Sequence, residues 1–455
     1  MVTFVGHSGA VRIRPGTGRG GAGDPVAARP ARRGRRASWL VGSWRAARAG
    51  VAALLVGLAC VSCVSRDGAP PPAPSRSDPS CPPSPGIVGD EVRLGLLYPD
   101  SGNAASLFGP FRAGVDARLG VVNADGGVHG RSLAYRWQDD GSQPGVNRTA
   151  AQRLVEEQDV FGIMESTVAS DGSAEYLHDL GVPVTGTSLD AAWTRFDNMF
   201  SYSNMIADGV SVSTWGEFVA DQGGTSALIA VSTLSAASGE LAEELRASLE
   251  GAGVRVVGTV EATGPIDLRV VGNQVRDSGA DTLVGTVTGG AFGQVVLGAK
   301  AAGADLRVVL SPSGYDQSLL QAFGSLLGDL NVNLFVDYQP FELDLPGHRA
   351  FLAAMGRYAP QMQPPNRQAS LSGWIAADMF VRGLAEAGPC PTRQRFLDGL
   401  RAVRDYSAGG LLPAPIDFTT SFGQLGRCYT FLRVAPDGQR FEVLRPAPRC
   451  GILGT

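Results

Sequence analysis

Residues 92–137 contain the pattern that most constrains the fold of this chain. An apolar run at 92–98 predicts a buried strand, and a polar turn at 99–102 follows it. The next apolar residues recur at every fourth position, as on one stripe of a helix: Leu107, Phe111, Val115 and Leu119. A Gly-rich stop and a second extended run at 133–137 complete a βαβ unit. Since ligands of open parallel sheets bind outside the carboxyl ends of the strands, we expect the loop after the first strand to bind a ligand.

The strand and helix pattern repeats after this unit. Short helices are predicted at 150–157 and 172–180, and strands at 160–164 and 182–184. A loop rich in Ser and Thr follows each strand, so two hydroxyl clusters are expected at the same edge of the sheet. Together with free N–H groups at helix amino termini, they can seat an anionic group such as a carboxylate. Taken singly, the same residues fit equally well as helix N-caps.

A second block with the same layout begins near residue 225, and a chain of 455 residues is long enough for two or three domains. Its predicted strands lie at 227–231, 254–260, 282–287 and 307–310. Its predicted helices lie at 239–250, 270–277 and 294–301. The remaining predicted elements are an extended segment at 331–338, helices at 371–387 and 396–403, and a hairpin of 428–434 with 440–444. We therefore expect an α/β protein with two lobes of similar fold.

The amino-terminal segment has the pattern of a targeting signal. Its arginines precede an apolar run at 51–59, which has the length of a secretory signal core, whereas a membrane-spanning helix needs about 20 apolar residues. Ala59 and Cys60 resemble the lipobox of bacterial lipoproteins, so residues 1–60 are the predicted leader and Cys60 the predicted lipidation site, with Cys63 as the alternative. Translation from near Val41, twin-arginine export and a cytosolic protein with a basic arm remain open alternatives.

The charge of the chain changes sharply after this leader. Residues 1–59 hold ten Arg and one acid, so of the 39 basic and 43 acidic residues the remainder keeps 29 and 42, a formal charge of −13. Nucleic-acid binding needs a clustered basic face, so an acidic body argues against it. Residues 61–90 are rich in Pro and are predicted to form a semi-rigid tether.

Cysteine usage agrees with export. Apart from Cys60 and Cys63 at the candidate lipidation sites, the cysteines form an even set of four: Cys81, Cys390, Cys428 and Cys450. Four cysteines allow three pairings, and the sequence does not choose among them. We favour Cys390 with Cys428 and Cys81 with Cys450.

Residues 90–450 resemble the type I periplasmic binding proteins, in the leucine/isoleucine/valine-binding and amide-binding branch of solute receptors for ABC importers. The order and spacing of short segments carry the resemblance. These segments are 92–97 with the turn at Ser101-Gly102, 123–131, Asp139-Asp140, 181–184, 278–281 and the Cys-containing tail. The resemblance implies two flavodoxin-like (Rossmann-like) lobes with parallel central sheets, joined by a three-crossover hinge.

The same resemblance sets the expected domain boundaries. Residues 91–206 plus 339–390 form lobe 1, and residues 207–338 plus 391–450 form lobe 2. The crossovers are expected near 204–209, 337–341 and 388–392.

Family ligand contacts can be carried over position by position. In lobe 1 they fall on Phe108, Ser166, Thr167, Thr187 and Ser188, which in amino-acid receptors hold the ligand carboxylate with hydroxyl and backbone N–H groups. Lobe 2 departs from the family pattern. Ser238 follows the first strand of that lobe where amino-acid binders place an aromatic, Thr288 lies in the next loop, and Ser313 replaces the acid that grips the ligand ammonium.

The missing acid bears on the class of ligand. A buried ammonium without an acidic partner costs several kcal/mol, more than a few hydrogen bonds return. Either Asp316 takes over this role or the ligand is not an α-amino acid. We favour the second and expect a small neutral or anionic solute.

These observations predict a binding protein and not an enzyme. The four His are dispersed, and no catalytic or nucleotide-binding motif lies in a suitable context. We expect a monomer without cofactor or metal, anchored by its lipid to the outer face of the bacterial cell membrane, that delivers a branched-chain amino acid, an amide or a small carboxylate to an ABC permease. The alternative is a ligand-sensing receptor domain that signals to a membrane partner.

Overall fold

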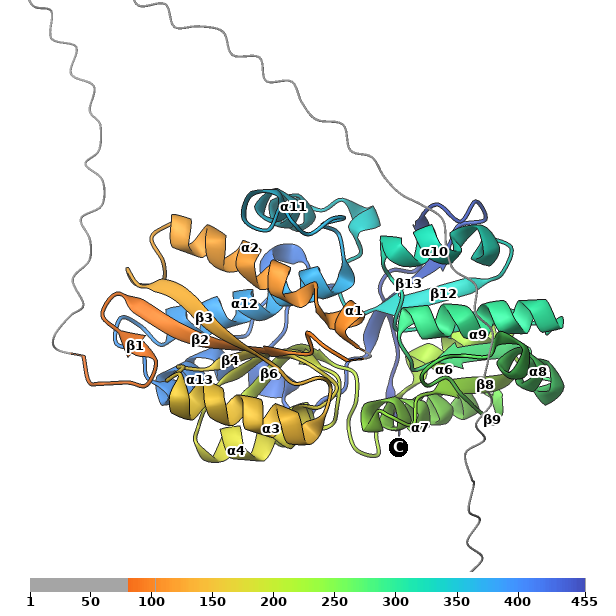
Figure 1. Cartoon of the computed structure of the whole chain (residues 1–455), viewed down its shortest axis with the longest axis horizontal. Coiled ribbons are helices and arrows are strands. Elements are labelled where there is room, and N and C mark those ends of the chain that lie inside the picture. Colours follow the sequence, from red (N-terminus) through yellow and green to blue (C-terminus); the bar gives the residue numbers. More distant parts are fainter. Residues whose placement is uncertain (1–80, 103, 455) are drawn as a thin grey trace, which may run out of the picture. The chain divides into compact units, whose positions relative to one another are not determined.

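The computed structural model describes residues 81–102 and 104–454, which form two sheets of mostly parallel strands covered by helices (Figure 1). The predicted leader with Cys60, and most of the predicted tether, lie outside the described residues. No helix in the described part combines the length and the apolar composition that a membrane span requires.

The first sheet contains the βαβ unit predicted from residues 92–137, which is confirmed. Strand β2 (Glu91–Tyr98) lies parallel to β3 (Ser132–Asp139) and to β4 (Ile163–Ser166). Beyond β4 follow β5 (Val184–Ser188) and β6 (Met199–Asn204), also parallel, while the short β1 (Ile87–Val88) pairs antiparallel with β2. The carboxyl ends of β2, β4 and β5 therefore meet at one edge of this sheet.

Helices cover both faces of the first sheet, with α2 and α12 on one face and α3 and α4 on the other (Figure 1). The helices of its amino-terminal part are α1 (Ala105–Phe108), α2 (Phe111–Ala124), α3 (Pro144–Gln152), a π-helix at Arg153–Glu157, a 3-10 helix at Ser170–Gly172, α4 (Ala174–Asp179) and α5 (Ala192–Arg195). Those contributed by the later chain are α11 (Pro346–Tyr358), α12 (Gln368–Glu386), α13 (Arg393–Arg401), a 3-10 helix at Ala408–Gly410 and α14 (Phe418–Ser421). A 3-10 helix at Phe341–Leu343 lies against Tyr315 in the loop after β11, since the Phe341 N–H donates to the Tyr315 hydroxyl.

Glycines allow α2 and α12 to pack backbone against backbone. A Cβ added to Gly114 of α2 would lie 1.8 Å from the carbonyl oxygen of Ser370. A Cβ added to Gly373 of α12 would lie 2.0 Å from the carbonyl oxygen of Phe111. Both distances are far inside van der Waals contact, so only glycine fits at either position. This close packing fixes the amino-terminal turn of α12 beside the start of α2.

The second sheet has the strand order β14-β13-β12-β11-β10-β8-β9. Its parallel strands are β8 (Ser226–Val231), β9 (Arg255–Glu261), β10 (Thr282–Gly285), β11 (Val308–Ser311) and β12 (Val332–Val336). Its antiparallel strands are β13 (Cys428–Val434), β14 (Phe441–Val443) and β15 (Arg449–Cys450). The predicted carboxyl-terminal hairpin is confirmed as β13 and β14. A separate pair joins β7 (Ser211–Val212) to β16 (Leu453–Gly454).

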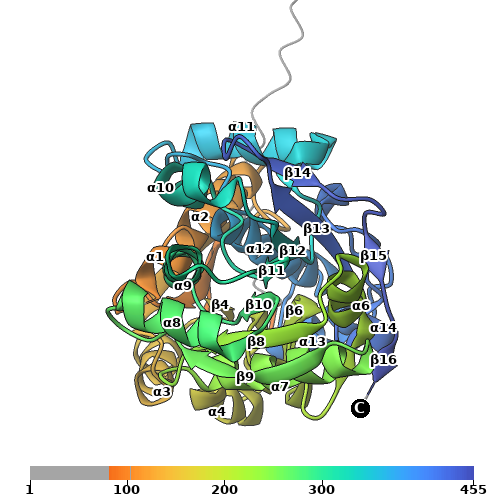
Figure 2. The same cartoon turned by 90° about the vertical axis from the view of Figure 1, so that its right-hand side faces the viewer.

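Alternate residues of β8 belong to different apolar clusters, as expected for a strand buried on both faces. Ala227 and Ile229 belong to one cluster with residues of α6 (Ser213–Asp221) and α7 (Ala236–Gly251). Leu228 and Ala230 belong to another with residues of three further helices (Figure 2). These are α8 (Leu268–Ser278), α9 (Gly289–Ala302) and α10 (Gln317–Leu327). The second sheet is therefore covered on both faces.

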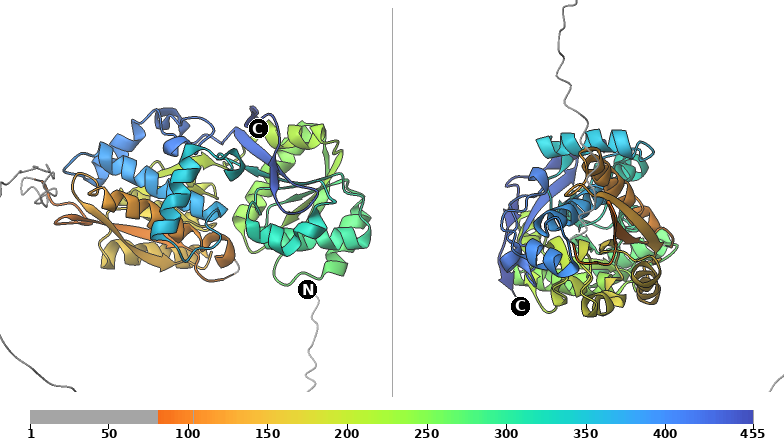
Figure 3. Two further views of the ribbon diagram at one scale, coloured as in Figure 1. Left: turned by 90° about the horizontal axis from the view of Figure 1, so that it is seen from above. Right: turned by 90° about the vertical axis from the view of Figure 1, so that its left-hand side faces the viewer.

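The chain passes three times between the two sheets. The first two passages, from β6 to β7 and from β12 to the helix at Phe341–Leu343, fall at the predicted crossovers near 204–209 and 337–341. The crossover predicted near 388–392 is wrong. The Phe396 ring of α13 lies 4.7 Å from that of Phe380, in α12 of the first sheet's cover. The chain therefore returns to the second sheet only between α14 and β13, and Figure 3 shows the helices after α12 beside the first sheet. The segment from residue 391 to α14 thus belongs with the first sheet and not, as expected, with lobe 2.

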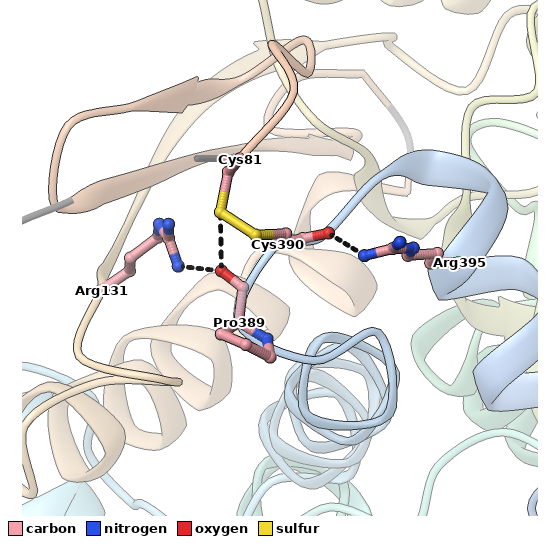
Figure 4. Close-up of a disulfide and its surroundings, with 5 residues drawn as sticks. All are labelled: Cys81, Arg131, Pro389, Cys390 and Arg395. Carbon is pink, nitrogen blue, oxygen red and sulfur yellow. Dashed lines mark hydrogen bonds between the residues drawn. A yellow bond between two sulfur atoms is a disulfide. The ribbon is translucent and has the colours of Figure 1, made fainter. Parts of the chain in front are cut away.

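All four expected cysteines form disulfides, but the favoured pairing is wrong. The bonds are Cys81–Cys390 and Cys428–Cys450. Cys428 in β13 and Cys450 in β15 are register partners on adjacent strands, which the spacing along the chain does not reveal. Cys81 reaches the loop after α12, where Arg131 Nη1 donates to the Pro389 carbonyl oxygen at 2.6 Å (Figure 4).

Candidate functional site

Hydroxyl groups gather at the carboxyl edge of the first sheet, as the sequence predicts. Ser166 ends β4 and is the register partner of Thr187 on the neighbouring β5. Thr167 follows Ser166 and Ser188 ends β5, and both residues are buried. The fold therefore brings together four of the predicted contact residues from two separate loops.

Three of these hydroxyls, those of Thr167, Thr187 and Ser188, are buried and form no hydrogen bond of good geometry among the described residues, although Thr167 faces Asp140 and Thr187 faces the Tyr202 hydroxyl. None of the four residues caps a helix, because the helices that follow begin after Ala169, Ser173 and Ala191. The N-cap interpretation of these residues is thus wrong. A buried hydroxyl without a partner costs about 1–3 kcal/mol, so these groups are available to a bound solute.

The first loop adds an apolar wall to this edge. Phe108 ends the short helix α1 and is only 4% exposed. The next turn adjoins α12, because Ser370 Oγ donates to the Pro110 carbonyl oxygen at 3.1 Å. The amino terminus of α12 therefore lies beside the first loop.

Tyr202 and Ser372 were not foreseen from the sequence. The Tyr202 hydroxyl on β6 lies 3.0 Å from the Ser372 Oγ on α12. Burial raises the pKa of Tyr202 well above its ordinary value, so it is a neutral phenol. β6 had not been recognised as a strand, and a serine inside an amphipathic helix gives no signal of its own.

The carboxyl edge of the second sheet carries the other predicted residues, but here the hydroxyls are engaged. Ser238 Oγ lies 2.8 Å from Thr286 Oγ1 and accepts from the Ser232 N–H at 2.9 Å. Thr288 caps α9 by accepting from the Ala291 N–H. Ser313 lies in the loop after β11, which touches the start of α9, since a Cβ on Gly289 would lie 2.7 Å from the Cα of Gly314.

Asp316 is held in place by two interactions. Its Oδ1 accepts from the Ser318 N–H at 2.8 Å, which caps α10. Its Oδ2 accepts from Arg367 Nε at 2.7 Å. The carboxylate that the sequence offered as a substitute for the missing family acid is therefore already paired with a cation.

A buried acid network lies at the same edge as the hydroxyls of the first sheet. Asn147 Nδ2 donates to Asp140 Oδ2 at 3.1 Å and to Glu165 Oε1 at 2.8 Å. Burial raises the pKa of Glu165 to about 8, with the charges of Asp140 and Asp190 adding to the effect. Burial also raises the pKa of Asp190 to about 7. This network was not foreseen from the sequence, although an acid directly after the apolar run 160–164 was a signal.

The two edges lie close to each other. Val168, next to the hydroxyls after β4, packs against the apolar cluster of the second sheet, and Ala191 after β5 belongs to that cluster.

Two surface cavities lie elsewhere. The larger, of about 250 Å³, is lined by α2, α12 and residues 405–409, and the smaller, of about 190 Å³, by α6 and the β13–β14 region. Within the part that the structure describes, no group of three His, Cys, Asp or Glu side chains is placed to share a metal ion.

Comparison with known proteins identifies relatives over most of the chain. The family model described as periplasmic binding protein matches residues 91–439. A comparison with curated proteins gives no match.

Solved structures of similar fold come from several bacteria. A solute-binding protein of an ABC transporter from R. palustris, in complex with benzoate, is 19% identical, covers 77% of this chain and 95% of its own, and has a TM-score of 0.64. LivJ, a branched-chain amino acid transporter substrate-binding protein from Streptococcus pneumoniae, in complex with isoleucine, is 15% identical and covers 78% and 99%, with a TM-score of 0.65. A branched-chain amino acid ABC transporter protein from Thermus thermophilus, with bound valine, is 18% identical and covers 79% and 97%, with a TM-score of 0.68.

Proposed function

Because this chain belongs to the periplasmic binding protein family, whose members bind solutes and are not enzymes, we propose that it captures one small polar solute outside the cytoplasm and delivers it to an ABC importer. The solute binds between lobe 1, built on the first sheet, and lobe 2, built on the second. The contact residues of lobe 1 are Phe108, Ser166, Thr167, Thr187 and Ser188. Those of lobe 2 are Ser238, Thr288, Ser313 and Asp316, the last through the Arg367 guanidinium that it binds.

The observation that carries this proposal is the hydroxyl edge of the first sheet. The register of β4 with β5 places Ser166 opposite Thr187, and Thr167, Thr187 and Ser188 keep buried hydroxyls without partners. Unpaired buried polar atoms occur elsewhere among the described residues as well, but here three hydroxyls gather at two neighbouring strand ends, and each costs free energy. A solute with oxygen atoms would satisfy them.

The solute class follows from the polar chemistry of the edge. Hydroxyls suit a carboxylate or an amide, and the relatives of similar fold bind benzoate, isoleucine and valine. We propose a branched-chain amino acid, an amide or a small carboxylate.

The anchoring of the protein follows from its amino terminus. We propose that Cys60 carries a lipid on the outer face of the cell membrane and that residues 61–80 hold the binding domain away from the bilayer. The last part of the predicted tether, residues 81–90, belongs instead to lobe 1, because Cys81 is bonded to Cys390 and β1 pairs with β2. The fold then acts as a monomer beside its permease.

Ligand-dependent thermal stability tests the binding function. The purified protein is heated with isoleucine, valine, leucine, benzoate, benzamide, urea and small aliphatic carboxylates, because a compound that binds only the folded state raises Tm. We expect a saturable rise with at least one compound and its loss in Ser166→Ala. A panel without any shift would contradict the proposal.

Uptake measurements test delivery to an importer. A strain without this protein should lose uptake of the compound that gave the shift, and the wild-type chain should restore it. Loss of a transcriptional response with normal uptake would instead support the sensory alternative.

A further inference from the structure

We propose that Arg367 selects solutes that carry a carboxylate and lack an ammonium group. This inference rests on the proposed solute-binding function and narrows it to simple organic acids. It concerns a residue outside every segment that sequence analysis assigned to the site.

The guanidinium of Arg367 is held at one side and open at the other. Its Nε donates to Asp316 Oδ2 at 2.7 Å, and the two side chains are 22% and 16% exposed. Among the described residues, neither terminal nitrogen of Arg367 has a hydrogen-bond partner, and neither is buried. One edge of the guanidinium therefore fixes the side chain, and its two Nη groups remain accessible as a fork.

Arg367 lies where the two halves meet. It is the residue before α12, and the next residue, Gln368, reaches the Pro312 carbonyl oxygen in the loop after β11. One turn further, Ser370 bonds the turn after Phe108, and Ser372 bonds Tyr202 on β6. The start of α12 thus connects the loops of both sheets that the family resemblance assigns to the ligand.

Charge excludes an ammonium from this position. Asp316 is the only acid in the loop at 312–316, and both of its oxygens are occupied, by Arg367 and by the Ser318 N–H. An ammonium that displaced Arg367 would leave a half-buried guanidinium unpaired, which is costly. The loop after β11 therefore faces the Arg367 cation and holds no free anion of its own. Glu342, which faces the same loop, is engaged by the Tyr315 hydroxyl at 2.6 Å.

The same geometry suits a carboxylate. The two Nη groups of an arginine match the two oxygens of a carboxylate in a bidentate contact. α12 starts without a side-chain cap, so its first N–H groups and the positive end of its dipole also favour an anion. The buried unpartnered hydroxyls of Thr187 and Ser188 then remain for the other oxygen atoms of the acid.

Calorimetry with matched compounds tests the inference on the full protein. Leucine, 4-methylpentanoate and 3-methylbutan-1-amine share one carbon skeleton and differ only in their charged groups, and benzoate and benzamide form a second pair. We expect each carboxylate to bind at least tenfold more tightly than its zwitterionic, cationic or amide counterpart. Arg367→Gln should weaken carboxylate binding at least tenfold and leave amide binding unchanged, and Arg367→Lys should restore part of the loss.

Two further variants keep the test decisive. Arg349→Gln removes an arginine that pairs with Asp344 on the surface, and it should leave all affinities unchanged. Asp316→Asn keeps an oxygen acceptor for Arg367 and removes its negative charge, so carboxylate binding should tighten, even if Arg367→Gln fails to fold. Tighter binding of leucine than of 4-methylpentanoate, unaltered carboxylate binding in Arg367→Gln, or weaker binding in Asp316→Asn would overturn the role of Arg367 while the solute-binding function stands. If no compound bound at all, the proposed function itself would fail.

Discussion

Cys81 is bonded to Cys390 across a separation of 309 residues, so the first described residue of the chain is joined to the loop between α12 and α13. Arg131 and Arg395 hold the same loop through the carbonyl oxygens of Pro389 and Cys390, at 2.6 and 3.1 Å. On the proposed anchoring through Cys60, the tether therefore ends on the half of the molecule that carries the buried hydroxyls.

The two disulfides should differ in how much they stabilise the fold. In the chain-entropy account a cross-link stabilises by restricting the unfolded state, and the effect grows with the length of the closed loop. Cys81–Cys390 closes 309 residues and Cys428–Cys450 closes 22. Replacing both cysteines by serine should lower the free energy of unfolding by roughly 5 kcal/mol for the first pair and about 3 kcal/mol for the second. Urea unfolding without reductant measures both losses, and an equal or larger loss for Cys428–Cys450 would refute the entropic explanation.

The close packing of α2 on α12 should make Gly114 intolerant of any side chain. In Gly114→Ala the new Cβ would meet the Ser370 carbonyl oxygen, so the helices must separate, at a cost of about 3 kcal/mol or more. Gly239 in α7 is exposed, and a Cβ there meets nothing within 4 Å. Gly239→Ala should therefore raise the free energy of unfolding by up to about 1 kcal/mol. Denaturant midpoints of the two variants give the comparison. A destabilised Gly239→Ala would show that the space around the added Cβ does not decide the effect of these substitutions.

Local sequence patterns predicted the helices and strands, whereas contacts between distant segments could not be predicted from the sequence. Phe111, Val115 and Leu119 of the predicted stripe lie within α2, so periodicity alone revealed this helix, whereas Leu107 lies in the separate helix α1. The third crossover was misplaced because only the packing of Phe396 against Phe380 decides on which sheet α13 lies. The disulfide pairing failed for the same reason.

The residues of the candidate site were likewise predictable only where they follow from local sequence patterns. Ser166 and Thr187 were predictable, because polar residues after consecutive parallel strands must share an edge. The pair of Asp316 and Arg367 was not, because it joins residues 51 positions apart in the two halves. Asp316 by itself suggested a free acid, and only the geometry shows that it is occupied.

Buried Glu165 should make the stability of the protein depend on pH. Its pKa is about 8 in the folded state against an ordinary value of 4.5, so the folded state holds the proton more tightly than the unfolded state. Glu165 therefore contributes its full stabilisation below about pH 4.5, and this stabilisation is lost as the pH rises through about 8. Its size is roughly 1.4 kcal/mol for each unit by which folding shifts the pKa. Glu165→Gln keeps an oxygen that can accept from Asn147 and should flatten this decline. Chemical unfolding at several pH values measures it, with the exposed Glu175→Gln as control. An unchanged slope in Glu165→Gln would mean that another group titrates.

Substitutions of two threonines on β5 should affect stability and solute binding separately. The Thr187 hydroxyl has no partner, whereas Thr185 Oγ1 donates to the Ala376 carbonyl oxygen of α12 at 2.8 Å. Valine keeps the shape of threonine and removes the hydroxyl. Thr187→Val should therefore leave the free energy of unfolding unchanged or raise it, since a buried unpaired group is lost.

Solute affinity, in contrast to stability, should depend on Thr187 and not on Thr185. For the compound that shifts Tm most, Thr187→Val should weaken binding about tenfold, the equivalent of about 1.4 kcal/mol. Thr185→Val should lower the free energy of unfolding by about 1 kcal/mol, because its hydrogen bond to the Ala376 carbonyl oxygen is lost, and should leave the affinity intact. Titration calorimetry and urea unfolding of both variants test this crossed pattern. If Thr187→Val bound the solute as tightly as the wild type, the hydroxyl edge would not be the site, whatever the solute is.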